Sequence, residues 1–236
     1  MLSKNQIKNI TRLKQKKYRQ QEGLFIAEGG KVIKEFLNST FKLVDLFTTE
    51  TFNVENESII SEADLKKISC LTTPNTALAI FKIPNSKDLK NEGLILALDD
   101  IRDPGNLGTI IRLCDWFGIK QLVCSHKTVD CYNPKVVQAT MGSLTRVKIV
   151  YTDLSAYLKA INLPVFGAFM DGKNVYQTNL PKAGILVLGN EANGISSIIE
   201  TCVTDKISIP RFGDLQATES LNVATAGAIL LSEFRR

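Results

Sequence analysis

The chain has 236 residues, a formal net charge of +5, 44% hydrophobic residues and 22% charged residues, a composition typical of a globular protein with one large or two modest domains. No apolar run approaches the roughly 20 residues that span a bilayer, and the basic N-terminus lacks the apolar segment of a secretory signal. We therefore expect no membrane association and a cytoplasmic location.

The cysteine and histidine content argues against several kinds of site. The five cysteines are scattered and include no Cys-x-x-Cys pair, which disfavours both a disulfide framework and a structural zinc site. His126 is the single histidine, so a histidine-based metal site and a Ser-His-Asp triad are both improbable. We predict no bound metal.

Positive charge is concentrated at the start of the chain. Residues 1–35 carry nine basic and three acidic side chains. Within residues 1–22, Ile7, Ile10 and Leu13 are spaced to form a narrow apolar stripe among many cations, which predicts a basic amphipathic helix or arm. Such charge is typical of a protein that binds a polyanion, although a solvated basic helix without a partner explains it equally well.

Residues 24–81 alternate short apolar segments with helical patterns, which predicts a small α/β unit. The polar segment 84–93 begins with Pro84 and ends with Gly93, a composition typical of a connector. We place the domain boundary there, with a first domain at residues 1–88 and a second at residues 92–236.

Beyond the connector, the sequence predicts strands that alternate with helices. The apolar runs have the character of strands buried on both faces, and they occupy residues 94–98, 121–124, 165–169, 185–188 and 207–209. A helical pattern over residues 107–117 ends before Gly118, and Asn133-Pro134 is a typical helix start. This alternation predicts an α/β domain with a mostly parallel sheet covered on both faces.

Three polar segments follow predicted strands, at residues 103–112, 188–194 and 220–224, and the first two contain glycines. Because ligands of open α/β sheets bind at the carboxyl ends of strands, we expect the three segments to meet in one crevice. Neither the dinucleotide fingerprint nor the P-loop pattern is present. Taken alone, each residue has an ordinary explanation: Arg112 as a surface arginine, Glu191 as a capping carboxylate or as an ion-pair partner of Arg112, and Ser220 and Asn222 as N-caps of the final helix.

Together, the three segments resemble the SpoU (TrmH-like) family of RNA ribose 2′-O-methyltransferases. That family follows the patterns Asn-x-Gly-x-x-x-Arg, Leu-Gly-x-Glu-x-x-Gly, and Ile-Pro followed by Ser-Leu-Asn-Val. The corresponding residues here are Asn106, Gly108 and Arg112, then Leu188, Gly189, Glu191 and Gly194, then Ile209, Pro210, Ser220, Leu221, Asn222 and Val223. The front of the chain, with Lys16-Lys17-Tyr18-Arg19, resembles the substrate-binding domain, related to ribosomal protein L30e, that some members carry.

The resemblance implies a fold, a cofactor and partners. The expected fold is an L30e-like α/β domain followed by a trefoil-knotted (SPOUT, α/β knot) methyltransferase domain. The expected cofactor is S-adenosylmethionine, the expected substrate is structured RNA, with rRNA favoured over tRNA, and the expected assembly is a homodimer with its active site near the interface.

The resemblance also implies roles for individual residues. The residues expected to act on the target hydroxyl or to hold the ribose are Arg112, Asn106, Glu191, Ser220 and Asn222. The residues expected to bind the cofactor are Gly189, Ile209, Leu221, Leu188, Gly194 and Pro210. Charge and resemblance together give the candidate RNA contacts Lys14, Lys16, Lys17, Arg19 and Arg211. Arg211 stands where the family usually has methionine, and the loop at residues 212–219 is longer than in the shorter members.

Two other functions are compatible with such a scaffold. A noncatalytic RNA-binding protein would not need the convergent polar set of Arg112, Glu191 and Asn222, which favours an enzyme. A base methyltransferase on a related knotted fold is disfavoured by the Ser220-Leu221-Asn222 segment.

Overall fold

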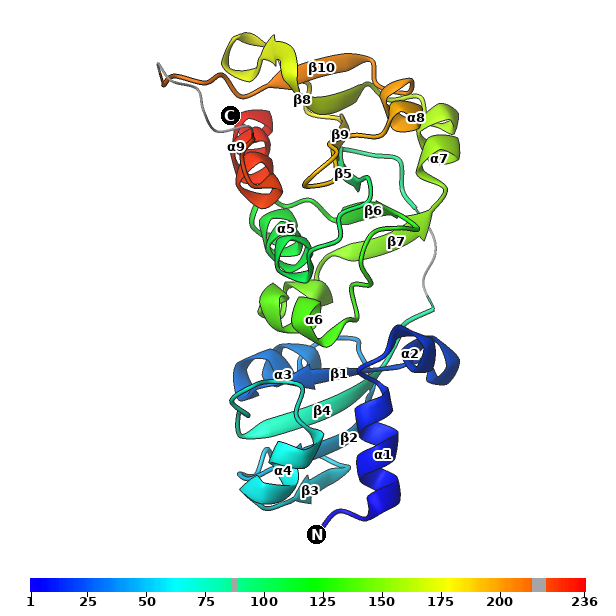
Figure 1. Ribbon diagram of the computed structural model, residues 1–236, viewed down its shortest axis with the longest axis vertical. Coiled ribbons are helices and arrows are strands. Elements are labelled where there is room, and N and C mark those ends of the chain that lie inside the picture. The colour runs from blue at the N-terminus through cyan, green and yellow to red at the C-terminus, as the bar shows by residue number, and fades with distance from the viewer. Residues whose placement is uncertain (86–88, 214–219) are drawn as a thin grey trace. The chain divides into compact units, whose positions relative to one another are not determined.

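The computed structural model describes residues 1–85, 89–213 and 220–236, and these form two units (Figure 1). The first unit comprises Met1–Ser86 together with Asp130–Thr145, and the second comprises Lys87–Val129 and Arg146–Arg236. The first unit is therefore built from two separate segments of the chain, which the sequence patterns do not reveal. Residues 86–88, where the sequence analysis ends the first domain, lie outside the described part of the chain.

The basic N-terminal segment forms two helices where the sequence predicts one helix or arm. They are α1 (Lys4–Arg12) and α2 (Lys16–Glu22). A capping box between Ser3 and Gln6 starts α1, and Gly23 ends α2 in a left-handed conformation with φ of 66°. The break between the helices follows Leu13, which is 2% exposed and packs in the core. Burial of this leucine turns the chain where helix propensity alone would continue.

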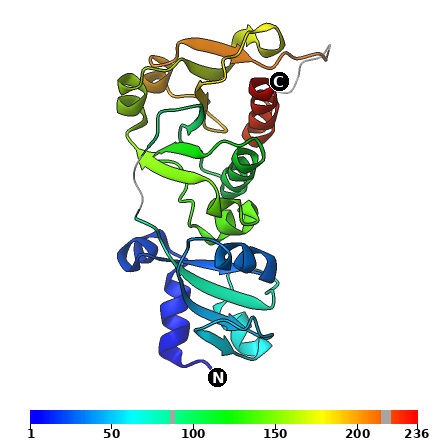
Figure 2. The same cartoon turned by 180° about the vertical axis from the view of Figure 1, so that it is seen from behind.

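The sheet of the first unit has four strands and separates two hydrophobic clusters. Chain order is β1 (Leu24–Glu28), α3 (Gly30–Leu37), β2 (Leu43–Thr48), β3 (Glu57–Ile59), α4 (Glu62–Ile68) and β4 (Ala77–Lys82), and strand order is β1-β4-β2-β3. Strand β4 pairs antiparallel with β1 and β2, while β3 pairs parallel with β2. Ile26, Phe47 and Leu78 pack with the apolar side chains of α1 and α4, so these helices cover that face of the sheet (Figure 2).

The segment from Asp130 to Thr145 completes the core on the other face. It contains α6 (Pro134–Thr140) and a 3-10 turn at Ser143–Thr145. The Tyr132 ring lies 4.7 Å from the Phe25 ring, which also contacts Phe36 and Phe81, and burial raises the pKa of the Tyr132 hydroxyl. Aromatic burial of this kind is a large part of core stability, so the first unit needs this distant segment.

The second unit contains a six-stranded sheet in which every neighbouring pair is parallel, as the sequence predicts. Strand order is β10-β8-β9-β5-β6-β7. The elements are β5 (Leu94–Leu98), α5 (Pro104–Trp116), β6 (Gln121–Ser125), β7 (Lys148–Thr152), α7 (Leu154–Ala160), β8 (Val165–Asn174), a 3-10 turn at Val175–Gln177, β9 (Gly184–Leu188), α8 (Ser197–Glu200), β10 (Asp205–Ser208) and α9 (Val223–Arg235).

Helices cover both faces of this sheet. Ile95, Val187 and their neighbours pack against α7 and α8, while α5 and α9 pack together on the opposite face (Figure 1). The sheet strands are buried throughout β5 and β9, which is why these segments read as continuous apolar runs. The trefoil knot implied by the resemblance stays a prediction.

Candidate active site

The two central strands end side by side and begin the site. Leu98 at the end of β5 pairs with Leu188 at the end of β9, and the Asp99 backbone N–H donates to the Leu188 carbonyl oxygen at 2.9 Å. The chain then turns back after β9, and Asn190 and Gly194 exchange two backbone hydrogen bonds of 2.9 Å. The carboxyl ends of β5 and β9 therefore place the first two sequence motifs next to each other, as the topology of parallel sheets favours.

Two glycines allow this turn. A Cβ at Gly189 would lie 2.5 Å from the Gly194 carbonyl oxygen and would also overlap the Ile195 backbone, so no larger residue fits. Gly194 has φ of 67°, in the left-handed region that glycine adopts without strain. The glycine spacing of the second motif is therefore a steric requirement of the turn.

The third motif joins the first two through a chain of side-chain hydrogen bonds. Asn222 donates from Nδ2 to Oδ1 of Asn106 at 2.8 Å, and Asn106 donates from its own Nδ2 to Oε1 of Glu191 at 3.0 Å. Asn222 is also the N-cap of α9, where its Oδ1 accepts from the backbone N–H groups of Ala224 and Thr225. Three segments that are far apart in sequence thus converge, and Asn222 serves both as a cap and as part of the cluster.

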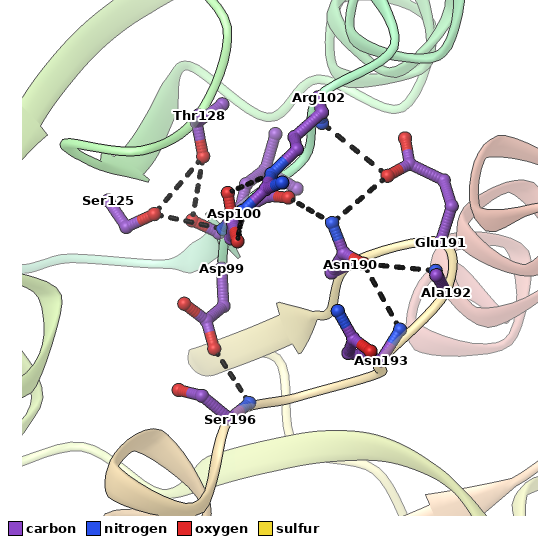
Figure 3. A network of polar contacts seen from close by, with 11 residues as sticks. Asp99, Asp100, Arg102, Ser125, Thr128, Asn190, Glu191, Ala192, Asn193 and Ser196 are labelled. Atoms are coloured by element: carbon purple, nitrogen blue, oxygen red, sulfur yellow. Dashed lines mark hydrogen bonds and ion pairs between the residues drawn. The ribbon is translucent and has the colours of Figure 1, made fainter.

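A network around the end of β5 fixes the loop that carries Glu191 (Figure 3). Asn190 donates to the Asp100 carbonyl oxygen at 2.7 Å and accepts from the backbone N–H groups of Ala192 and Asn193. Asp100 has φ of 58°, and its backbone N–H donates to Ser125 Oγ at 2.9 Å. Loop geometry is thus set by hydrogen bonds at both ends.

Arg102 completes this network from the loop before α5. Its guanidinium donates two hydrogen bonds to the Asp100 carboxylate, at 3.0 and 2.9 Å, and this hydrogen bonding, with the Asp100 charge, raises the pKa of Arg102. Asp99, which is 6% exposed, accepts from the Ser196 backbone N–H at 2.8 Å. Sequence patterns assign no role to Asp99, Asp100, Arg102 or Asn190; their position directly after strands is the signal that points to them.

A cavity of about 1060 Å³ lies beside this cluster. All six predicted cofactor contacts line it, as do Glu191, Ser220 and Arg211 from the other predicted sets. Its remaining walls include Ala168, Phe169 and Met170 of β8. The register between β8 and β10 shifts so that Lys206 pairs with Gly167 and Ile207 with Lys173, which leaves residues 168–172 out of the ladder; the first three of these residues line the cavity.

Arg112 lies apart from both the cavity and the cluster. It is exposed on α5, does not line the cavity, and makes no hydrogen bond or ion pair within the described ranges. Six residues separate it from Asn106, a rotation of about 240° at 3.6 residues per turn, so the two side chains leave α5 in different directions. The Glu191 carboxylate contacts Asn106 and the backbone N–H groups of Arg102 and Asp103, so the ion pair with Arg112 that the sequence allowed is not formed.

The candidate RNA contacts of the first unit differ in exposure. Lys16 and Lys17 are exposed on α2, and Lys14 is exposed with its ammonium donating to the Ser69 carbonyl oxygen at 2.7 Å. Arg19 corrects the prediction, because it is 2% exposed and donates to the Asp130 carboxylate and to the Leu13 and Lys14 carbonyl oxygens. Its guanidinium is a structural group that ties α2 to the Asp130–Thr145 segment.

Arg211 is exposed at the rim of the cavity. Residues 214–219 of the loop that the sequence analysis singles out lie outside the described residues. Over the ranges that the structure describes, acidic, histidine and cysteine side chains form no group suited to a metal ion. None of the helices in those ranges has the length and apolar character to cross a membrane.

Comparison with known proteins places both units in described families. Residues 93–232 match the SpoU rRNA Methylase family, and residues 4–79 match the MRM3-like substrate binding domain. The chain is 29% identical to the 23S rRNA (guanosine(2553)-2′-O)-methyltransferase RlmP of Bacillus subtilis over 99% of this chain and 97% of that protein.

Solved structures agree over the whole chain. A protein of the TrmH family of RNA methyltransferases from Porphyromonas gingivalis is 40% identical with a TM-score of 0.90, covering 100% of this chain and 98% of the other. An AdoMet-bound rRNA methyltransferase from Sinorhizobium meliloti is 28% identical with a TM-score of 0.88, covering 100% and 96%. The converging motifs and these matches agree: the chain belongs to the SpoU rRNA methylase family and is an RNA methyltransferase.

Proposed function

We propose that this protein transfers a methyl group from S-adenosylmethionine to a ribose 2′-hydroxyl of ribosomal RNA, with the cofactor in the cavity beside the Asn106–Glu191–Asn222 cluster. Family membership and the AdoMet-bound relative make it an S-adenosylmethionine-dependent RNA 2′-O-methyltransferase rather than a noncatalytic RNA binder. The observation that supports the site is the convergence of the three motifs: the second and third line the cavity, and Asn106 of the first is hydrogen-bonded to both of them.

The cavity residues suit this cofactor. Its volume of about 1060 Å³ lies at the upper end of the roughly 300–1,000 Å³ typical of small-molecule sites. Leu188, Ile209 and Leu221 offer apolar surface, and the tight turn at Gly189 leaves backbone groups without a side chain over them. When bound, S-adenosylmethionine supplies an activated methyl group. The protein's part would be to hold the cofactor against these walls and to exclude water.

The polar cluster would position the ribose and its phosphate. Asn106, Glu191 and Asn222 hold one another by hydrogen bonds of 2.8 and 3.0 Å, so their remaining donors and acceptors keep fixed directions before the substrate binds. Ser220 lines the cavity next to them and offers a further hydroxyl. Well-oriented groups reach effective molarities of about 10⁵–10⁸ M, so alignment of a weakly acidic hydroxyl replaces the need for a strong base.

Arg112 would act on the target hydroxyl or its phosphate by position and charge. A guanidinium is effectively always protonated, so a role as general base is physically strained; the proton would leave late in the step or through water. Because Arg112 does not reach the cavity of its own chain, we propose that it serves the site of a second copy in a homodimer. Trp116 lies one turn after Arg112 on the same side of α5 and is 84% exposed. Tryptophan is enriched among the residues that contribute most to protein–protein interfaces.

RNA would bind across the first unit as well. Residues 4–79 match a substrate-binding domain, and Lys16 and Lys17 are exposed, so they are available to phosphates. Arg211 at the cavity rim would add a contact near the reacting ribose. The cytoplasm, where ribosomal RNA is assembled, is the proposed location.

Incubation with radiolabelled S-adenosylmethionine and rRNA tests the function. We expect the label on ribose, detected after digestion as a methylated dinucleotide that resists alkali because its 2′-oxygen is blocked. Label confined to a base, or no label on any RNA, would refute the proposal. Mapping ribose methyls across cellular RNA with and without the gene would then identify the nucleotide.

A further inference from the structure

A second cavity, of about 240 Å³, lies in the first unit between α1 and the sheet. Its floor is apolar and rigid: Ile10, Leu13, Phe47 and Ile80 are each at most 5% exposed. The volume is below the roughly 300–1,000 Å³ of sites for drug-sized ligands. The cavity therefore suits one small planar ring rather than a whole nucleotide.

Two of the polar side chains that line this cavity, Asp45 and Asn9, have no hydrogen-bond partner among the described residues. Asp45 pairs with Ile80 in the β2–β4 ladder and stands two residues before Phe47, so it shares their face of the sheet. Within the described part of the chain its carboxylate has no hydrogen bond or ion pair, nor has the Asn9 amide, and partial burial raises the pKa of Asp45. Both residues are exposed and line the cavity, so their donors and acceptors are accessible to a ligand that enters it.

Arg12 closes the other side of the cavity in a fixed position. Its Nη2 lies 3.0 Å from Glu22 Oε1, and its guanidinium carbon lies 5.9 Å from the centre of the Tyr18 ring. Its buried Nε has no hydrogen-bond partner among the described residues. A guanidinium that is held in place and has an unused N–H donor can form a hydrogen bond to the edge of an unpaired RNA base.

We propose that this cavity binds one unpaired guanine of the RNA substrate, a refinement that rests on the proposed function. Guanine presents two adjacent donors, N1–H and the 2-amino group, on one edge, and these match the two oxygens of the Asp45 carboxylate. Its ring would lie against the apolar floor, with Asn9 and Arg12 at the remaining edge. Adenine and cytosine have one amino donor on that edge and fit the carboxylate less well.

The charge around the cavity agrees with a nucleic acid occupant. Lys8 is exposed next to Asn9 on α1, and Lys16 and Lys17 are exposed on α2. These cations would attract the phosphates on either side of the bound base, while Asp45 provides the acceptor for the base itself. Of the two carboxylates that line the cavity, Glu22 is paired with Arg12, which leaves Asp45 to accept from the base.

Short labelled RNAs test the proposal with the full-length chain. The probes are a five-nucleotide uridine RNA with one central guanosine and the same RNA with inosine, which lacks the 2-amino group. By fluorescence anisotropy at low salt we expect the wild type to prefer guanosine by about tenfold or more, as one hydrogen bond to a charged group provides. Asp45→Asn should remove the preference, and Asn9→Ala should weaken binding of both RNAs.

Glu55→Gln is the matched control, because Glu55 is an exposed carboxylate of the same unit that does not line the cavity; it should keep the preference. Equal affinity of the wild type for both RNAs, or a preference that survives in Asp45→Asn, would overturn the proposal. Ribose methylation of rRNA by the wild type is measured in parallel. Methylation without a guanosine preference refutes the base cavity alone, whereas absence of methylation refutes the proposed function.

Discussion

The polar groups of the two cavities are organised in opposite ways. Beside the large cavity of the second unit, Asn106, Glu191 and Asn222 are bonded to one another and to backbone. In the small cavity of the first unit, Asp45 and Asn9 have no partners among the described residues. The first arrangement is a framework that keeps its shape before anything binds, whereas the second offers exposed hydrogen-bonding groups that no other described side chain occupies.

The largest effect is expected from the residue that the framework leaves out. Arg112→Ala should reduce the rate of methyl transfer at least about 100-fold, in the range for loss of a transition-state contact, because alanine carries neither the charge nor the hydrogen-bond donors of the guanidinium. Affinity for S-adenosylmethionine, measured by calorimetry, should be unchanged, since Arg112 does not line the cavity.

Lys159→Ala, which removes an exposed cation of α7 in the same unit, is the control and should keep full turnover. Full activity of Arg112→Ala would show that the exposed arginine has no part in the reaction. Weakened binding of S-adenosylmethionine by Arg112→Ala would show that Arg112 acts on the cofactor rather than on the RNA.

A change in the turn after β9 tests the framework itself. Gly189→Ala should weaken cofactor binding by tenfold or more, because the added methyl overlaps the Gly194 and Ile195 backbone and a packed backbone cannot yield cheaply. Calorimetric titration with S-adenosylmethionine measures this. Gly213→Ala is the matched control on the same cavity, since nothing lies within 4 Å of a Cβ there. Equal affinities for the two variants would contradict the steric argument.

Smaller effects separate two kinds of cation in the first unit. Arg19→Ala should lower the free energy of unfolding by about 3 kcal/mol, since it leaves a largely buried Asp130 carboxylate unpaired.

The double variant Lys16→Ala with Lys17→Ala should leave the free energy of unfolding unchanged. It should reduce the slope of log K for RNA binding against log salt concentration by roughly 0.7–0.9 for each lost phosphate contact. Denaturant melts and RNA titrations at several salt concentrations measure both. Unchanged salt dependence in the lysine variant would remove α2 from the RNA surface.

Much of the second unit was predictable because its strands are buried on both faces. The runs at β5 and β9 are apolar at every position, apart from Gly184 at the start of β9, and Gly118 follows the end of α5. The Asn133-Pro134 start of α6, in the first unit, is a local signal as well. Strand β7 was missed because all five of its residues are half-buried at the sheet edge. Its sequence, Lys148–Thr152, therefore lacks both the continuous apolar run and a clear alternation.

The site was predictable to the extent that it depends on steric and capping requirements. The turn after β9 requires glycine at 189 and 194, and the start of α9 requires a capping side chain such as Asn222. These residue types are therefore recognisable in the sequence. Arg19 shows the limit, because it looks like the other cations of its segment, and what buries it is Asp130, 111 residues away. A local sequence pattern cannot predict a contact between residues so far apart in the chain.

The discontinuity of the first unit has a consequence for chimeras. Asp130–Thr145 supplies Tyr132 to the aromatic core and Asp130 to Arg19, yet it is encoded between two strands of the methyltransferase sheet. A chimera that exchanges only the N-terminal residues for those of a relative would therefore pack the relative's four-stranded sheet against the original Asp130–Thr145 segment. Transplanting substrate preference between members of this family requires both segments to travel together.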